Sequence, residues 1–170
     1  WEQTDGYFDP TVGALVNAYG FGPAKSLKKI DQSTIDSLLN ISGFDKVSLL
    51  SDGTINKVHK NTYLDFNAIA KGYAVDALAS MLQSLGYTQF LVEVGGELFA
   101  SGLHPEREKP WRVAIDHPKQ DANRTFIATL PLQNQGLASS GNYRKFRTDA
   151  SGKRYVHTCL LYTSDAADDS

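Results

Sequence analysis

The stretch from residue 66 to residue 85 carries the strongest periodic pattern in the chain. Apolar side chains recur in it at intervals of three and four residues, and they are Ile69, Tyr73, Val75, Leu78, Leu82 and Leu85. This spacing predicts a helix with one apolar face, because side chains three and four positions apart lie on the same side of a helix. Asp65 or Asn67 can cap the start of this helix, and Gly86 can close its end.

Strand patterns dominate the chain after this helix. A largely apolar strand is expected over 89–94, and the pair Gly95-Gly96 separates it from a second apolar stretch at 98–100. Further strands are expected over 111–115, 125–130, 143–147 and 154–157.

The chain before the helix shows shorter elements. A short helix or turn is expected near 11–16, and a second helix over 33–42, with Ser33 at its start and Gly43 after its end. The segments 46–50 and 55–59 flank a Ser-Asp-Gly turn, which is typical of a β-hairpin. A few helices among meandering strands predict a single α+β domain with a mostly antiparallel or mixed sheet.

Composition excludes several classes of protein. The 170 residues, of which 41% are hydrophobic and 11% aromatic, suit one folded domain rather than a disordered chain. Lys and Arg number 17 against 19 Asp and Glu, so no basic field favours nonspecific binding of nucleic acid. A single cysteine excludes an intrachain disulfide framework and a multi-cysteine metal cluster. No apolar run approaches the ~18 residues of a membrane-spanning helix.

The segment 65–72, Asp-Phe-Asn-Ala-Ile-Ala-Lys-Gly, is the most informative for chemistry. It lies at the expected start of the long helix, where free backbone N–H groups and the helix dipole favour anionic ligands. Asp65 can accept a hydrogen bond from a base or ribose, and Lys71 can reach a phosphate. The alternative is a capping aspartate followed by a solvated lysine.

Other segments leave two readings open. The Gly95-Gly96 pair allows close approach of a ligand to the backbone, or simply makes a tight turn. The loop 139–143 can donate hydroxyl and amide groups to a phosphate, or is a turn. The only Gly-x-Gly, at 20–22, has no βαβ context, so a Rossmann site is not supported. The four histidines are not paired at metal-ligand spacing.

Taken together and in order, these segments resemble the family of FAD:protein FMN transferases, the ApbE-type flavin transferases. The resemblance runs from about residue 4 to residue 157. The matching segments are DGYFDPTVGALVN (5–17), GFGP (20–23), DFNAIAKGYAVD (65–76), LVEVGGE (91–97), WRVAI (111–115), SSGNYR (139–144) and GKRYVH (152–157).

The resemblance implies an α+β ApbE-like domain and an enzyme that takes FAD as its substrate. With Mg²⁺ on the pyrophosphate, such an enzyme attaches FMN through a phosphoester bond to a Ser or Thr of an acceptor protein and releases AMP. Two alternatives remain. One is an FAD pyrophosphatase, in which water replaces the acceptor hydroxyl, and the other is a non-catalytic FAD-binding protein.

The family's FAD contacts fall on two segments of this chain. Tyr7, Phe8 and Asp9 would line the FAD site, and Asp65 and Lys71 would contact FAD. The family often has Glu at the position of Lys71, so a lysine there favours a direct contact with phosphate.

Two further roles follow from the resemblance. The backbone carbonyl of Ala68 would bind Mg²⁺, a hard cation that prefers oxygen ligands. His157 matches the family's histidine near the reacting phosphate and would accept the proton of the attacking hydroxyl.

The family pattern stops after His157. The family continues with an Asp/Asn-Pro-x-Thr-Gly motif and later acidic magnesium ligands, whereas this chain continues with TCLLYTSDAADDS. We therefore predict that 1–158 is the central part of a transferase domain truncated at both ends, and that 159–170 is a non-native tail. By family habit, the location would be the bacterial cell envelope on the periplasmic side, with a lipid anchor outside this segment.

Overall fold

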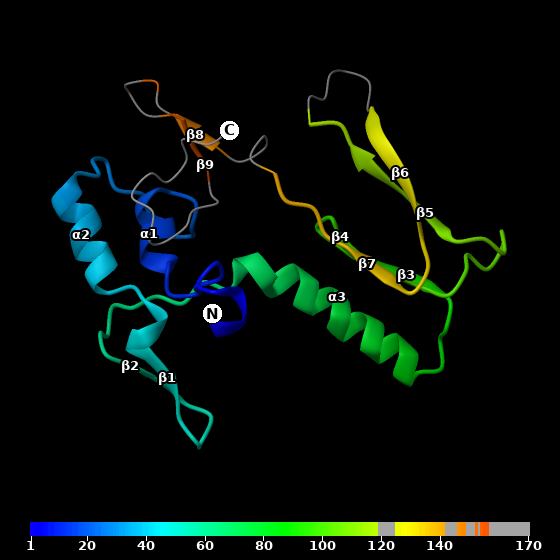
Figure 1. Cartoon of the computed structure of the whole chain (residues 1–170), viewed down its shortest axis with the longest axis horizontal. Helices are drawn as coiled ribbons and strands as arrows, with labels where there is room; N and C mark the ends of the chain where they lie inside the picture. The colour runs from blue at the N-terminus through cyan, green and yellow to red at the C-terminus, as the bar shows by residue number, and fades with distance from the viewer. Residues whose placement is uncertain (119–124, 142–145, 149–151, 153, 157–170) are drawn as a thin grey trace. The chain divides into compact units, whose positions relative to one another are not determined.

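A computed structural model describes residues 1–118, 125–141, 146–148, 152 and 154–156 (Figure 1). The chain divides into two compact units, and each is described by itself. The first unit consists of residues 1–66 and 145–170, and the second of residues 67–144. Few helices and several antiparallel sheets confirm the predicted α+β class. Among the described helices, none has the length and apolar character needed to cross a bilayer.

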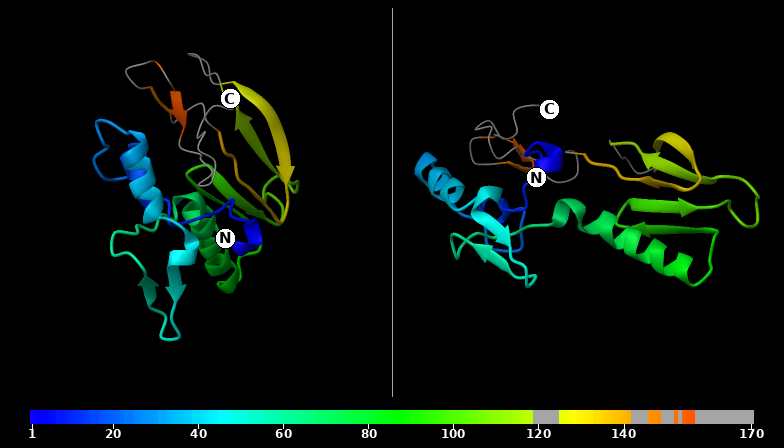
Figure 2. Two further views of the ribbon diagram at one scale, coloured as in Figure 1. Left: turned by 60° about the vertical axis from the view of Figure 1, so that its left-hand side comes forward. Right: turned by 60° about the horizontal axis from the view of Figure 1, so that its bottom comes forward.

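The second unit is built on the long helix α3 (Asn67–Ser84), which lies within one residue of the predicted bounds. It packs against a three-stranded antiparallel sheet of β3 (Phe90–Val94), β4 (Glu97–Ser101) and β7 (Gln135–Leu137), in the order β3-β4-β7. The helix runs along this sheet in each view (Figures 1 and 2). Gly86, with a φ of +86°, ends the helix, and Tyr87 N donates to the Leu82 carbonyl at 3.1 Å as a Schellman motif requires.

The two faces of this sheet have different cores. Phe90 and Val92 on β3 pack against Val75 and Ala79 of α3, joined by Phe99 of β4. On the opposite face, β4 packs against the antiparallel pair β5 (Trp111–Asp116) and β6 (Phe126–Leu132) through a second cluster formed by Leu98, Ala100 and Leu132. The unit is therefore layered as helix, sheet and hairpin.

The predicted apolar face of α3 is wrong in part. Val75 is buried and Leu82 is half-buried, but Ile69, Tyr73, Leu78 and Leu85 are exposed, Tyr73 to 75%. The helix packs instead on the stripe that includes Val75 and Ala79, because these small side chains bring it close to the aromatic rings of the sheet. Apolar residues occupy more than one side of this helix, so their spacing does not identify the buried stripe.

The first unit contains shorter elements. Its helices are η1 (Glu2–Thr4), α1 (Gly13–Ala18), α2 (Gln32–Asn40) and η2 (Phe44–Lys46). Its strands form two antiparallel hairpins, β1 (Val47–Leu49) with β2 (Ile55–Lys57), and β8 (Phe146–Thr148) with β9 (Arg154–Val156). Both hairpins were expected from the sequence, although the first strand of the second pair was expected to start at 143, outside the described residues.

The ends of α2 differ from the prediction. Asp31, not Ser33, caps its start, because the Asp31 carboxylate accepts from the Thr34 amide at 3.1 Å. Gly43 does not close its end. The Lys46 ammonium does so instead, since it donates to the carbonyls of Leu39 and Asn40 at 3.2 and 3.0 Å.

Candidate functional site

The loop before α1 holds the three residues expected to line an FAD site. Tyr7 is 74% exposed, Phe8 is half-buried and Asp9 is buried. The Asp9 Oδ1 atom accepts a hydrogen bond from the Thr11 amide at 2.8 Å and another from the Thr11 hydroxyl at 2.6 Å. The bond to the amide two residues further on makes this an Asx turn. Thr11 Oγ1 in turn accepts from Gly43 N at 2.6 Å.

The second oxygen of the Asp9 carboxylate is free to bind a donor. Oδ2 is buried, and within the described part of the chain it has no hydrogen-bond partner. A buried carboxylate oxygen without a donor is costly, by about 1–3 kcal/mol or more for a charged group. This atom therefore suits a ligand that brings a hydroxyl or amino group.

Asp65 is held beside this loop by backbone contacts. Its N–H donates to the Pro10 carbonyl at 2.7 Å, and the Gly13 N–H donates to the Tyr63 carbonyl at 3.1 Å. Gly13 is required there, because a Cβ atom would lie 2.1 Å from the Tyr63 ring. The structure thus brings Asp65 and the Tyr7–Asp9 loop together, although they are far apart in sequence.

An apolar pocket of about 340 Å³ opens in the same unit. It is lined by Pro10, Phe44, Val47, Leu49, Ile55, Leu64 and Phe66. Pro10 follows Asp9 directly, and Leu64 and Phe66 flank Asp65. A flat aromatic ring is the kind of group that such an apolar lining accepts.

Ala68 and Lys71 lie in the first turns of α3, in the second unit. The Lys71 ammonium forms an ion pair with the Glu97 carboxylate through Oε2, a buried oxygen that accepts no hydrogen bond within the described residues, and it donates to the Gly95 carbonyl at 3.1 Å. The Glu97 side chain is 17% exposed and that of Lys71 is 47% exposed. Lys71 is therefore a fixed cation rather than the freely solvated lysine of the alternative reading.

The Gly95-Gly96 pair forms the tight turn between β3 and β4. Its φ values of +58° and +97° are both positive, as a two-residue type I′ hairpin turn requires. A Cβ atom on Gly95 would lie 2.9 Å from Lys71 Cδ, so the missing side chain also leaves room for the lysine stem. The glycine pair thus makes the expected tight turn. Its backbone is also approached closely, but by the protein's own Lys71 rather than by a ligand.

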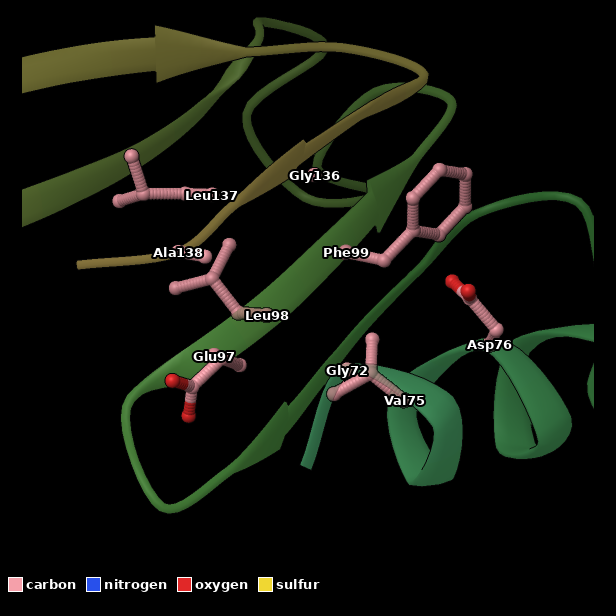
Figure 3. A pocket seen from close by; sticks show the side chains of 9 residues that line it. All are labelled: Gly72, Val75, Asp76, Glu97, Leu98, Phe99, Gly136, Leu137 and Ala138. Carbon is pink, nitrogen blue, oxygen red and sulfur yellow. The ribbon is translucent and has the colours of Figure 1, made fainter. Parts of the chain in front are cut away.

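A pocket of about 250 Å³ lies beside this ion pair, between α3 and the strands β4 and β7. Figure 3 shows Val75 and Asp76 projecting from the helix toward the sheet, and Glu97 at the start of β4. Gly72, Leu98, Phe99, Gly136, Leu137 and Ala138 complete the lining. The pocket combines an apolar floor with two carboxylates.

The described residues do not by themselves make a magnesium site. No group of three or more His, Cys, Asp or Glu side chains in that part of the chain can hold a metal ion. Ala68 offers one carbonyl oxygen, whereas Mg²⁺ takes six ligands. The donor set seen here is therefore insufficient for the ion that the family resemblance implies.

Some of the residues singled out in the sequence lie outside the part of the chain that the structure describes. His157 and the tail 159–170 lie outside the described residues, as do residues 142 and 143 of the loop 139–143. Ser139, Ser140 and Gly141 are exposed, which is compatible with either reading of that loop. His104 is half-buried and packs against Trp111, with ring centroids 4.8 Å apart and the rings tilted by 42°, so it has a packing role.

Sequence reasoning missed the partners of the predicted residues. Thr11 holds Asp9, and Glu97 holds Lys71 across 26 positions of sequence. The sequence shows that Glu97 follows the glycine pair directly, but neither its burial nor its partner can be derived from that position.

Comparison with known proteins identifies the family of this chain. The model of the ApbE family matches residues 1–168. The chain is 39% identical over 160 residues to the FAD:protein FMN transferase of Haemophilus influenzae and 35% identical over 159 residues to that of Escherichia coli K12. These matches cover 91% of this chain but 45% and 44% of the two relatives, so the chain spans about half their length.

Solved structures give the same result. The flavin transferase ApbE from Vibrio cholerae matches with a TM-score of 0.78 at 33% identity, over 94% of this chain and 50% of that one. The ApbE protein from Thermotoga maritima matches with a TM-score of 0.78 at 29% identity, over 94% and 51% of the two chains. Sequence and fold therefore agree, and the chain belongs to the ApbE family.

Proposed function

We propose that this protein binds FAD and transfers its FMN half to a Ser or Thr hydroxyl of an acceptor protein. The observation that carries the proposal is the family match over residues 1–168, with relatives named FAD:protein FMN transferase. The buried Oδ2 atom of Asp9 and the fixed cation of Lys71 support it. One suits a hydroxyl or amino group of the ligand, and the other suits a phosphate.

The reaction requires attack of the acceptor hydroxyl oxygen on the phosphorus of the FMN half. A new phosphoester bond forms, the bond from that phosphorus to the bridging oxygen breaks, and AMP leaves with that oxygen. The hydroxyl proton passes to a base, the role proposed for His157. In-line placement of the hydroxyl and neutralisation of the pyrophosphate charge are the main demands of this chemistry.

The proposed contacts divide the FAD molecule by its chemistry. Lys71 suits the pyrophosphate, because an ammonium group stabilises phosphate oxygens. Asp9 and Asp65 suit hydroxyl or amino groups, because a carboxylate repels phosphate but accepts from such donors. The apolar pocket beside Pro10 suits a ring of the dinucleotide, and the exposed ring of Tyr7 is available to stack on it.

Magnesium is part of the proposed reaction. The ion would supply charge neutralisation on the pyrophosphate, with the Ala68 carbonyl among its ligands. The rest of its coordination shell would come from phosphate oxygens, water or residues outside the described part of the chain.

The test combines binding with product analysis. The purified protein is incubated with FAD and Mg²⁺, with and without synthetic peptides that carry one Ser or Thr, and with matched peptides that carry Ala instead. Transfer predicts AMP release together with flavin fluorescence on the Ser or Thr peptides only. EDTA should abolish both signals.

The other outcomes separate the alternatives. Release of FMN and AMP without labelled peptide identifies an FAD pyrophosphatase. Tight FAD binding without AMP identifies a non-catalytic flavin-binding protein. Absence of FAD binding overturns the proposal and both alternatives.

A further inference from the structure

We propose that Glu97 is a positioning residue that holds the Lys71 ammonium in place for the pyrophosphate of FAD. The inference deepens the proposed function and rests on it, because it takes Lys71 as a phosphate contact. Glu97 itself does not touch the ligand in this proposal. It acts through the lysine.

The contacts around Lys71 support this division of roles. The ammonium meets the Glu97 carboxylate and the Gly95 carbonyl, so it is held from two directions by one hairpin. The Glu97 side chain is 17% exposed, whereas that of Lys71 is 47% exposed. The anion is therefore mostly shielded from an approaching phosphate, while the cation stays accessible to it.

The backbone fixes the carboxylate before any ligand binds. Glu97 is the first residue of β4 and pairs with Val94, the last residue of β3. The two glycines between them close the hairpin with positive φ values, so the position of Glu97 follows directly from the turn. A Cβ atom added at Gly95 would lie 2.9 Å from Lys71 Cδ, so the glycine of this turn also leaves room for the lysine stem.

This arrangement reduces the entropy that FAD binding must overcome. Lys is among the side chains with the most rotamer freedom to lose when they are ordered. An unpaired Lys71 would have to be ordered by the ligand, whereas a paired one is ordered already. Removal of the Glu97 side chain should therefore weaken FAD binding about tenfold, the loss expected when one long side chain must be immobilised.

A double-mutant cycle tests whether Glu97 acts through Lys71. The dissociation constant of FAD is measured by flavin fluorescence for the wild type, E97A, K71A and the double variant. We expect E97A to weaken binding about tenfold and K71A to weaken it at least as much. The double variant should bind FAD as K71A does, because Glu97 has nothing to position once the lysine is gone.

A matched pair of variants isolates the charge. E97Q and E93Q remove the same carboxylate charge from the same hairpin, and each keeps a side-chain oxygen that can accept a hydrogen bond. Glu93 is exposed and accepts from the Gly96 amide at 2.6 Å, away from the described Lys71 contacts. E97Q should weaken FAD binding about threefold, less than E97A, and E93Q should leave it unchanged.

The outcomes separate this inference from the function on which it rests. If E97A and E97Q bind FAD like the wild type while K71A does not, Glu97 is not a positioning residue and the proposed function stands. If the losses of E97A and K71A add in the double variant, Glu97 acts by another route and the inference is overturned. If K71A binds FAD normally, the phosphate contact itself is wrong. Should E97A fail to fold, E97Q in the wild-type and K71A backgrounds decides the question.

Discussion

The two units of the molecule bury different chemistry. The second unit buries apolar side chains in two clusters, around Val92 on one face of its sheet and around Ala100 on the other. In the described part of the first unit, the buried apolar side chains are only the small ones of Pro10 and Ala18, and the other buried side chains include Asp9, Thr11 and Thr62.

The second unit is therefore ordered mainly by apolar packing, whereas buried hydrogen bonds order the described part of the first unit. In the first unit, Thr11 links Asp9 to Gly43, and the Thr62 hydroxyl donates to the Ile41 carbonyl at 2.8 Å. The bonds of Thr11 fix the Tyr7–Asp9 loop, which carries three of the proposed FAD contacts. A polar network tolerates an unsatisfied carboxylate oxygen only where a ligand or another donor completes it, so a binding loop is a reasonable place to find one.

The largest expected effect of a single substitution on stability is in the second unit, which has the two apolar clusters. Phe90→Ala removes a buried ring that packs on Val75 and Phe99, and should lower the free energy of unfolding by about 3–5 kcal/mol. Urea denaturation followed by circular dichroism measures this loss. Phe126→Ala is the matched control, because Phe126 is 51% exposed on β6. If Phe90→Ala lowers the free energy of unfolding by no more than about 0.5 kcal/mol, the range of surface substitutions, the cluster around Val92 does not stabilise the protein.

A smaller effect on stability is expected in the first unit, at the buried hydrogen bonds of Thr11. Thr11→Val keeps the shape of the side chain but removes its hydroxyl, so Asp9 loses a donor and Gly43 N loses its acceptor. The free energy of unfolding should fall by about 1–3 kcal/mol in the same denaturation experiment.

The control for this prediction is Thr54→Val. The Thr54 hydroxyl also donates to an aspartate, Asp52, at 2.7 Å, but both residues are exposed. Its loss should change the free energy of unfolding by no more than about 0.5 kcal/mol. If Thr11→Val is as harmless as Thr54→Val, the buried network does not order the first unit.

The sequence predicts the elements of both units better than their contacts. The helix over 66–85 and the strand over 89–94 match α3 and β3 within one residue at each end. β7 was missed, because Gln-Gly-Leu has no strand pattern of its own and becomes a strand only through pairing with 98–100 of β4.

In the candidate site, too, the sequence predicts individual residues better than the contacts between them. Motifs located Asp9, Asp65 and Lys71, since each lies in a recognisable local segment. Thr11 is a local partner of Asp9, two positions away, whereas the Lys71–Glu97 pair depends on the way α3 packs on β4. Local patterns do not contain such long-range pairings, which is also why the buried stripe of α3 was assigned incorrectly.

The smallest expected effect concerns Asp31 in the first unit. Like Asp9 it accepts hydrogen bonds from a threonine, but unlike Asp9 it is exposed. Hydrogen bonds from the Thr34 hydroxyl and amide, and then from the Ser33 hydroxyl, hold the pKa of Asp31 well below its ordinary value. Because the pKa is lower in the folded chain, ionised Asp31 stabilises the start of α2 above pH ~4, the ordinary pKa of an aspartate. That contribution is lost as the pH falls further, through the folded-state pKa.

Hydrogen exchange at the Thr34 amide measures this loss directly. Its protection factor should be constant from neutral pH down to about 4 and then decrease, because below that pH Asp31 takes up a proton when the cap opens but not while it is formed. Asp31→Asn keeps a capping side chain without a titrating group, so its protection should be lower at neutral pH and independent of pH. If the protection of Thr34 in Asp31→Asn decreases below pH 4 as it does in the wild type, another group causes the change and the Asp31 cap is not its origin. If protection in the wild type does not change at all, the ionised Asp31 cap does not stabilise the start of α2.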